Sequence, residues 1–244
     1  MNIGILAAGI TPDELLNQYG TYADMFVQLL GPDNPEFEFS VYEACNGILP
    51  DSVHACDGWI VTGSKFSVYE DIDWIHNLRN FVADAANSGL PMVGICFGHQ
   101  LIAEALGGRV HKNPGGWGLG VHEYHPTDAF ANQLGLPQGQ TMKVNAVHQD
   151  QVVKLPEGAD VIACSDFCPV AGLSYFGGRV VTLQPHPEFS LAFEADLLEN
   201  RKGIAFTEAD ANAGIESASA DNASIDSANI ARWMASVFTA HRNT

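Results

Sequence analysis

Short apolar segments that alternate with stretches of helical periodicity constrain this chain more than any other feature. Residues 3–8, 58–62 and 91–95 are apolar runs bounded by turn residues. Residues 13–30 and 72–86 carry apolar side chains at the three- and four-residue spacing of helices. Such alternation is typical of a parallel sheet with helices on both faces. We therefore expect an α/β protein with a three-layer αβα arrangement and a mostly parallel central sheet.

The length of 244 residues allows one large core, and we expect a single domain over 1–244. Further strands are predicted at 37–43 and 179–183 from their apolar runs and alternation. The tract 208–228 is rich in Ala, Ser, Asp and Asn. This composition predicts a flexible loop, followed by a last helix over 230–241.

Charge and cysteine usage limit the partners and the compartment. The chain has 11 Lys and Arg against 29 Asp and Glu, a formal charge of −18. Nucleic acid and anionic membranes are therefore not expected as partners. The amino-terminal segment lacks a basic signal region, no apolar run approaches a membrane span, and five cysteines do not suggest a disulfide framework. We expect a cytoplasmic protein, without a metal or cofactor; the Cys164 and Cys168 pair has no second pair beside it.

The segment GICFGHQ, residues 94–100, suggests a nucleophile. Cys96 follows the apolar run at 91–95, and the carboxyl ends of parallel strands face the binding crevice. Gly94 and Gly98 flank it as in a nucleophile elbow, where small neighbours allow a sharp turn. A helix that begins near Phe97 would favour the thiolate and leave backbone N–H groups for an oxyanion. The alternative is a free cysteine packed at a strand end.

The segment QPHPE, residues 184–188, offers the base that such a nucleophile needs. His186 and Glu188 are two residues apart, which places both side chains on one face of an extended chain. His186 could accept the thiol proton while Glu188 fixes the tautomer of the imidazole. An isolated histidine is more often a surface or core residue. The combination with Cys96 favours a Cys-His-Glu triad.

Together GICFGHQ, QPHPE and GWIVTGS resemble the class I glutamine amidotransferases, particularly those similar to the amidotransferase domain of GMP synthetase. The resemblance extends to about residue 201. It implies the flavodoxin-like fold of that family, and that Cys96 attacks a γ-glutamyl amide to form a thioester. It also implies two oxyanion donors, the backbone N–H groups of Phe97 and of Ser64, with Gly63 as the alternative. The family's Gly-Gly-Pro is replaced here by Gly-Ser-Lys.

The same resemblance implies contacts with the substrate. Gln100 matches the family glutamine that contacts the α-amino acid end of the substrate, although a solvent-facing glutamine is the alternative. His148 and Gln149 lie in a stretch whose backbone lines the glutamine pocket in the family, although 145–150 could equally be a polar turn. His99 lies beside the nucleophile, but its place on the helix directs it poorly at the sulfur.

Three hypotheses follow. The first is a stand-alone hydrolase acting on glutamine or a related γ-glutamyl compound, with a separate synthetase as a possible acceptor of the ammonia. The second is a γ-glutamyl peptidase, which the Gly-Ser turn resembles and which needs no acceptor. The third is a non-catalytic thiol-sensing domain, which would have no need of an oriented base.

Overall fold

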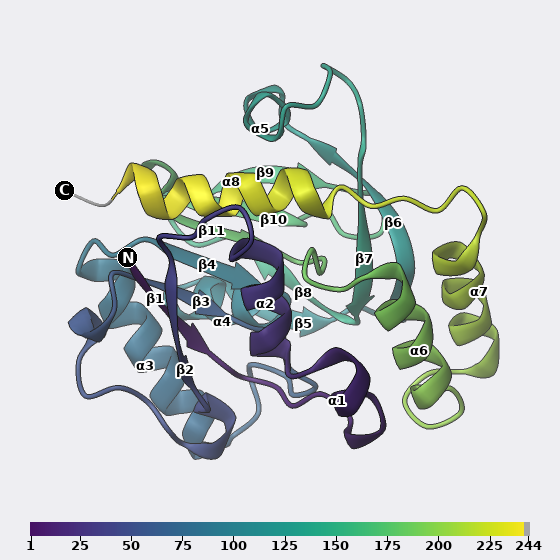
Figure 1. The fold of residues 1–244 in the computed structure, drawn as a ribbon, viewed down its shortest axis with the longest axis horizontal. Helices are drawn as coiled ribbons and strands as arrows, with labels where there is room; N and C mark the ends of the chain where they lie inside the picture. Colours follow the sequence, from purple (N-terminus) through teal and green to yellow (C-terminus); the bar gives the residue numbers. More distant parts are fainter. Residues whose placement is uncertain (242–244) are drawn as a thin grey trace.

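The computed structural model describes residues 1–241, which contain a nine-stranded sheet in the order β2-β1-β3-β4-β11-β10-β9-β6-β7 (Figure 1). Its first five strands are parallel, and the remaining four run antiparallel to their neighbours. The parallel strands are β1 Asn2–Leu6, β2 Glu38–Tyr42, β3 Gly58–Val61, β4 Met92–Ile95 and β11 Val180–Leu183. The antiparallel strands are β6 Gly118–Pro126, β7 Met142–His148, β9 Asp160–Cys164 and β10 Gly172–Tyr175. A separate two-stranded sheet joins β5 Arg109–Lys112 to β8 Asp150–Lys154.

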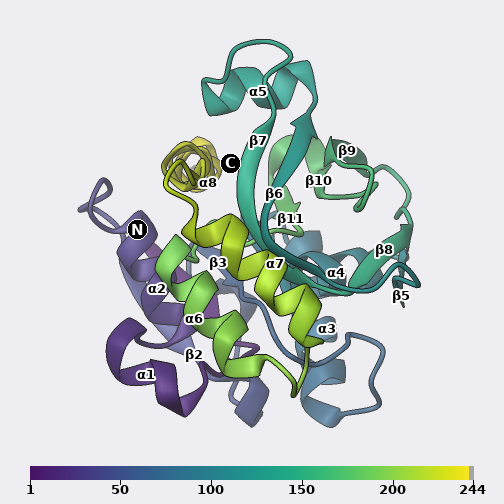
Figure 2. The ribbon, with the colours of Figure 1, turned by 90° about the vertical axis from the view of Figure 1, so that its right-hand side faces the viewer.

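Helices cover both faces of the large sheet (Figures 1 and 2). The helices are α1 Asp13–Tyr19, α2 Tyr22–Leu30, α3 Asp73–Asn87, α4 Phe97–Ala105, α5 Asp128–Leu134, α6 Leu191–Arg201, α7 Glu208–Ser219 and α8 Ser227–Ala240. Short 3₁₀ turns are η1 Ala44–Asn46, η2 Val53–Ala55 and η3 Phe176–Gly178. One apolar cluster joins α2 and α8 to the sheet, and a second joins α3 and α4 to it. The three-layer α/β prediction is confirmed.

The pairing of β4 with β11 brings the two sequence motifs together. The two strands are parallel, with Ile95 opposite Leu183, and the Cys96 N–H donates to the Leu183 carbonyl at 2.9 Å. All four residues of each strand are buried, as expected for parallel strands covered on both faces. The segments that follow β4 and β11 therefore leave the sheet side by side, at the carboxyl ends of the two strands.

The helix expected over 13–30 is two helices. Gly20 adopts φ 77° after α1, and Thr21 begins α2. The Thr21 hydroxyl accepts the Asp24 N–H at 3.0 Å, while the Asp24 carboxylate accepts the Thr21 N–H at 2.8 Å. This reciprocal cap satisfies free donors at a helix start, and the apolar periodicity on either side concealed it.

The flexible loop expected over 208–228 is wrong for its first half, which forms α7. Thr207 caps this helix by accepting the Asp210 N–H at 3.1 Å, and alanine, the best helix former, recurs along it. The small residues Ala211, Gly214 and Ala218 form a narrow buried face. The Ser217 hydroxyl also accepts the Val121 N–H of β6 at 2.9 Å. The polar composition therefore did not indicate this helix, which packs against the rest of the protein through small side chains. The last helix, expected at 230–241, begins at Ser227.

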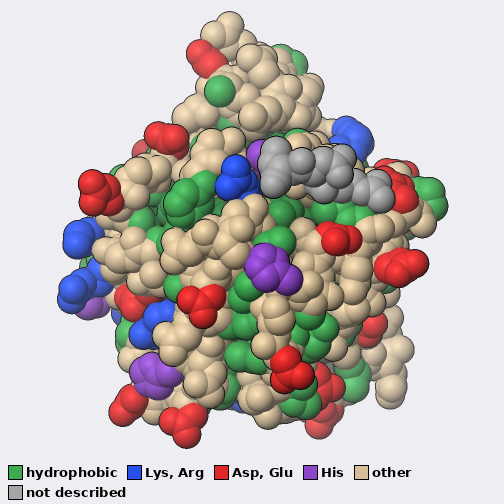
Figure 3. Space-filling view, turned by 90° about the vertical axis from the view of Figure 1, so that its left-hand side faces the viewer, with side chains coloured by type: hydrophobic (Ala, Val, Ile, Leu, Met, Phe, Trp, Pro, Cys, Tyr) green, Lys and Arg blue, Asp and Glu red, His purple; other side chains and the backbone are tan. Residues whose placement is uncertain are grey.

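The surface carries both charge signs. On the face drawn in Figure 3, Lys and Arg side chains are interspersed with Asp and Glu among the described residues. None of the helices within 1–241 is long and apolar enough to cross a membrane.

Candidate active site

Cys96 occupies the sharp turn between β4 and α4. Its backbone adopts φ 53° and ψ −104°, a strained combination for a residue with a side chain. Gly98 makes the turn possible, because a Cβ at that position would lie 2.3 Å from the Val61 carbonyl oxygen. The side chain of Cys96 is 5% exposed. The expected elbow is therefore present, with the thiol at the N-terminus of a helix.

His186 is held on three sides. Its backbone N–H donates to the Asn145 carbonyl at 2.8 Å, and its Nδ1 bonds to Glu188 Oε1 at 2.7 Å. The ring stacks on Phe189 with a centroid distance of 4.1 Å and an interplanar angle of 5°. The imidazole and the Glu188 carboxyl are both buried. This arrangement fixes the orientation of the ring and makes Nε2 the nitrogen that can exchange a proton.

The free side of the imidazole lies toward Cys96, because both side chains line one cavity and both lie within 3.7 Å of the Cβ position that Gly63 lacks. Burial alone would lower the pKa of His186, but the negative charges of Glu188 and Cys96 outweigh it and raise that pKa well above its ordinary value. The three side chains thus lie as a chain of neighbours from thiol to carboxyl. Such a chain can hold a thiolate beside an imidazolium, which combines a nucleophile with a proton donor.

The turn after β3 lies against this pair. A Cβ on Gly63 would lie 2.8 Å from His186 Cε1 and 3.7 Å from Cys96 Cβ. The Gly63 carbonyl accepts the Thr62 hydroxyl at 3.1 Å. Because the N–H and C=O of a trans peptide point in opposite directions, the Ser64 N–H is directed away from that bond. The Phe97 N–H, at the first position of α4, also has no partner inside the helix.

A cavity of ≈ 370 Å³ opens over Cys96 and His186. Three parts of its lining come from segments expected from the sequence: the turn of Gly63 and Ser64, the residue Gln100, and the segment 147–150. Further lining comes from positions without a motif, namely Ile10, Pro12, Tyr22, Lys65, Phe66, Ser67, Lys112, Trp117, Phe189, Leu197, Arg201 and 204–206. Its volume lies within the range of roughly 300–1,000 Å³ that holds small-molecule ligands.

Gln100 links segments of the cavity lining through hydrogen bonds. Its amide nitrogen donates to the Asp150 carbonyl at 2.9 Å and to Gln184 Oε1 at 3.0 Å, so its oxygen is the atom that can accept from a ligand. Asp150 in turn accepts the hydroxyls of Ser67 at 2.5 Å and Tyr69 at 3.0 Å. The segment after β3, α4 and the strand pair β7 and β8 are therefore cross-linked at one place.

His148 and Gln149 line the same wall at the junction of β7 and β8. His148 is 2% exposed, and burial lowers its pKa to about 3, so it is neutral. The Gln149 carbonyl accepts the Asn113 N–H at 3.0 Å. The segment is thus a strand junction, and the polar-turn interpretation of 145–150 is wrong.

His99 points into the core, where its Nδ1 bonds to the Thr182 hydroxyl at 2.7 Å and burial lowers its pKa to about 3. Three residues around the cavity had no sequence signal. Tyr22 comes from α2 and Arg201 from the last position of α6. Phe189, which follows QPHPE directly, provides the stacking surface for His186.

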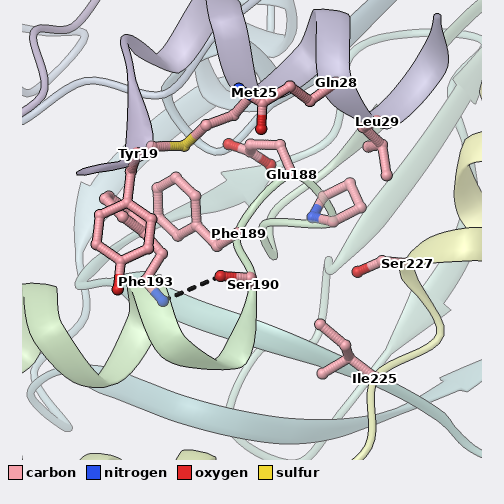
Figure 4. A pocket seen from close by; sticks show the side chains of 11 residues that line it. Tyr19, Met25, Gln28, Leu29, Glu188, Phe189, Ser190, Phe193, Ile225 and Ser227 are labelled. Carbon is pink, nitrogen blue, oxygen red and sulfur yellow. Dashed lines mark hydrogen bonds between the residues drawn. The ribbon is translucent and has the colours of Figure 1, made fainter. Parts of the chain in front are cut away.

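A second cavity of ≈ 300 Å³ lies beside Glu188, between α2, the segment 187–190, α6 and the residues before α8 (Figure 4). Met25 and Leu29 from α2 line it together with Phe193, and the Ser190 hydroxyl caps α6 by accepting the Phe193 N–H at 3.0 Å. Cys96 and His186 line only the first cavity, so the first cavity is the candidate active site.

Several known proteins resemble this chain over most of its length. Residues 18–203 match the model of the family glutamine amidotransferase class-I. The chain is 30% identical over 220 residues to a glutamine amidotransferase-like protein of Schizosaccharomyces pombe, covering 85% of this chain and 87% of that one. It is 29% identical over 212 residues to γ-glutamyl peptidase 5 of Arabidopsis thaliana, covering 83% of each. A glutamine amidotransferase structure from Methylobacillus flagellatus superposes with a TM-score of 0.74 at 20% identity, over 98% of this chain and 92% of that one.

Proposed function

Because the chain belongs to the class I glutamine amidotransferase family, we propose that it hydrolyses the γ-glutamyl amide bond of glutamine or of a related γ-glutamyl compound. The observation that carries this proposal is the placement of Cys96 beside His186, whose Nδ1 bonds to Glu188, at the base of an open cavity. In this proposal those three residues form the catalytic triad.

The reaction begins when the Cys96 thiolate attacks the γ-carbonyl carbon of the substrate. The resulting oxyanion accepts hydrogen bonds from the backbone N–H groups of Ser64 and Phe97. His186 gives its proton from Nε2 to the leaving nitrogen, the C–N bond breaks, and the amine departs. A thioester between Cys96 and the γ-glutamyl group remains.

Water completes the cycle. The neutral His186 now takes a proton from a water molecule, whose oxygen attacks the thioester carbon. The C–S bond breaks, glutamate leaves, and the thiolate and imidazolium are restored. Glu188 stabilises the imidazolium in both halves of the reaction. The same steps serve whichever amine occupies the leaving position.

A peptide-cleaving version of this function has specific support. The cavity continues past Cys96 to residues of α2, α6 and the 204–206 turn, which gives room beyond a γ-glutamyl group. The likeness to a γ-glutamyl peptidase agrees with it. If glutamine is instead the substrate, a separate synthetase that accepts ammonia would be the expected partner.

Glutamate release from glutamine and from γ-glutamyl dipeptides tests the proposal. We expect turnover by the wild-type protein and its loss in Cys96→Ala, with circular dichroism unchanged. Cys164→Ala is the matched control, because Cys164 is exposed and lies outside the cavity. A wild-type protein that reacts with a thiol-directed electrophile but turns over none of these compounds would support the thiol-sensing hypothesis instead.

A further inference from the structure

The candidate cavity collects positive charge in a strongly acidic protein. Lys65, Lys112 and Arg201 line it, although the chain carries a formal charge of −18. Among the described residues, none of these three forms an ion pair with a carboxylate. Both lysines are exposed, whereas Arg201 is half-buried. Solvent screens the exposed lysine charges more than that of Arg201, so Arg201 is the cation best placed to act on a ligand.

Arg201 lines the cavity from α6, the helix whose Phe193 packs on Phe189 beside the His186 ring. In the proposed reaction His186 protonates the leaving nitrogen, so that group extends beyond the His186 ring. Phe189 stacks on His186, and Tyr22 packs on Phe189 with a centroid distance of 5.6 Å. Burial raises the pKa of the Tyr22 hydroxyl, Glu188 and Cys96 raise it further, and the charge of Arg201 opposes them.

Another part of the cavity is built differently. Gln100 and the segment 148–150 line it with amide and carbonyl groups, and their hydrogen bonds to one another hold the wall in place. These groups, together with the Asp150 carboxylate, suit the ammonium of the α-amino acid end of a γ-glutamyl group. A guanidinium and a phenol on the leaving side suit a carboxylate, because a guanidinium binds that group through two parallel hydrogen bonds.

We infer that Arg201 and Tyr22 form a subsite for a carboxylate on the leaving group, so that the preferred substrates are γ-glutamyl amino acids or peptides and not glutamine. This inference rests on the proposed function of the same site. In a γ-glutamyl amino acid the leaving nitrogen is attached to the carbon that carries the carboxylate, so this group lies close to His186; in a longer peptide the carboxylate lies further along the leaving group. Ammonia released from glutamine would leave both side chains without a partner.

A pair of substrates that differ in one charge tests the subsite. γ-Glutamylglycine has a leaving carboxylate, and γ-glutamylglycinamide replaces it with a neutral amide of similar shape. We expect wild-type kcat/KM to favour the carboxylate by about tenfold, the size of one hydrogen bond to a charged group. In Arg201→Met this ratio should fall to about one, and in Tyr22→Phe it should fall partway.

Arg109→Met is the matched control, because Arg109 is exposed on β5 and outside the cavity. Its ratio should equal that of the wild type. The Arg201 carbonyl, which accepts backbone N–H groups from 204–206, is retained in Arg201→Met, and thermal melting checks that the variant folds.

The outcomes separate the two claims. Hydrolysis of both compounds at equal rates by the wild type would overturn the carboxylate subsite and leave the proposed function standing. A preference that survives in Arg201→Met would also overturn it. Hydrolysis of neither compound, nor of glutamine, would mean that the proposed function itself is wrong.

Discussion

A single methyl group at Gly63 should disable the site without unfolding the protein. Gly63→Ala would place Cβ 2.8 Å from His186 Cε1, in a space now empty. The backbone at Gly63 lies outside the left-handed region, so alanine is compatible with its conformation. The substitution also keeps the backbone N–H groups of the turn. Its effect should therefore fall on the imidazole.

The required displacement follows from the contacts of His186. Ordinary contacts of a Cβ begin at 3.4 Å, so the ring or the turn must move by about 0.6 Å. The ring is held by the bond of 2.7 Å to Glu188 and by Phe189 stacked at 4.1 Å, and neither neighbour allows a free slide. A misplacement of about 1 Å at a reacting group costs on the order of a hundredfold in rate. We expect kcat/KM to fall by about ten- to a hundredfold.

The assay is the release of glutamate from a γ-glutamyl substrate, with thermal melting of the same preparation. Gly115→Ala is the control, because its Cβ would meet only the side chain of Asn113, at 3.3 Å. We expect Gly63→Ala to melt close to the wild-type temperature while losing activity. Wild-type activity in Gly63→Ala would refute the tight contact between this turn and the imidazole.

Two further substitutions probe buried carboxyls. Glu188→Gln removes the charge that raises the pKa of His186. We expect kcat/KM to fall about a hundredfold or more, and the alkaline limb of its pH–rate profile to move to lower pH. An unshifted limb would contradict this. Glu194 is fully buried, and desolvation raises its pKa to about 8, against the opposing effects of His186 and the Gly120 N–H. Between the unfolded pKa of 4.5 and about 8, the folded carboxyl holds a proton that the unfolded chain has lost, so unfolding free energy declines with rising pH by up to roughly 1.4 kcal/mol per pH unit. Glu194→Gln should therefore melt higher than wild type at pH 8, with the difference vanishing near pH 4.5, and an equal difference at both pH values would contradict the cause.

The fold was predictable wherever one local pattern dominated. Strands such as β4 and β11 are continuous apolar runs, since a parallel strand is buried on both faces. The apolar spacing continues across Gly20 and therefore does not indicate the helix break there. Thr21 followed three residues later by Asp24 is the sequence signal for the new helix. The helix α7 was missed for the opposite reason. Its contacts use alanine, glycine and a serine hydroxyl, which leave no hydrophobic stripe to detect.

The residues of the candidate site also fall into two groups, those that a sequence motif marks and those that none marks, and this difference has a physical cause. Cys96 and His186 each follow a strand directly, so a motif of a few residues marks each one, and the parallel pairing of β4 and β11 joins them. Tyr22 and Arg201 reach the cavity only because α2 and α6 pack together through aromatic contacts such as Tyr22 with Phe193, at 6.3 Å. That packing depends on residues separated by most of the chain. A sequence motif at a strand end can thus identify the reacting side chains. The residues that we expect to determine substrate preference come together only when the helices pack, so they can be identified only from the structure.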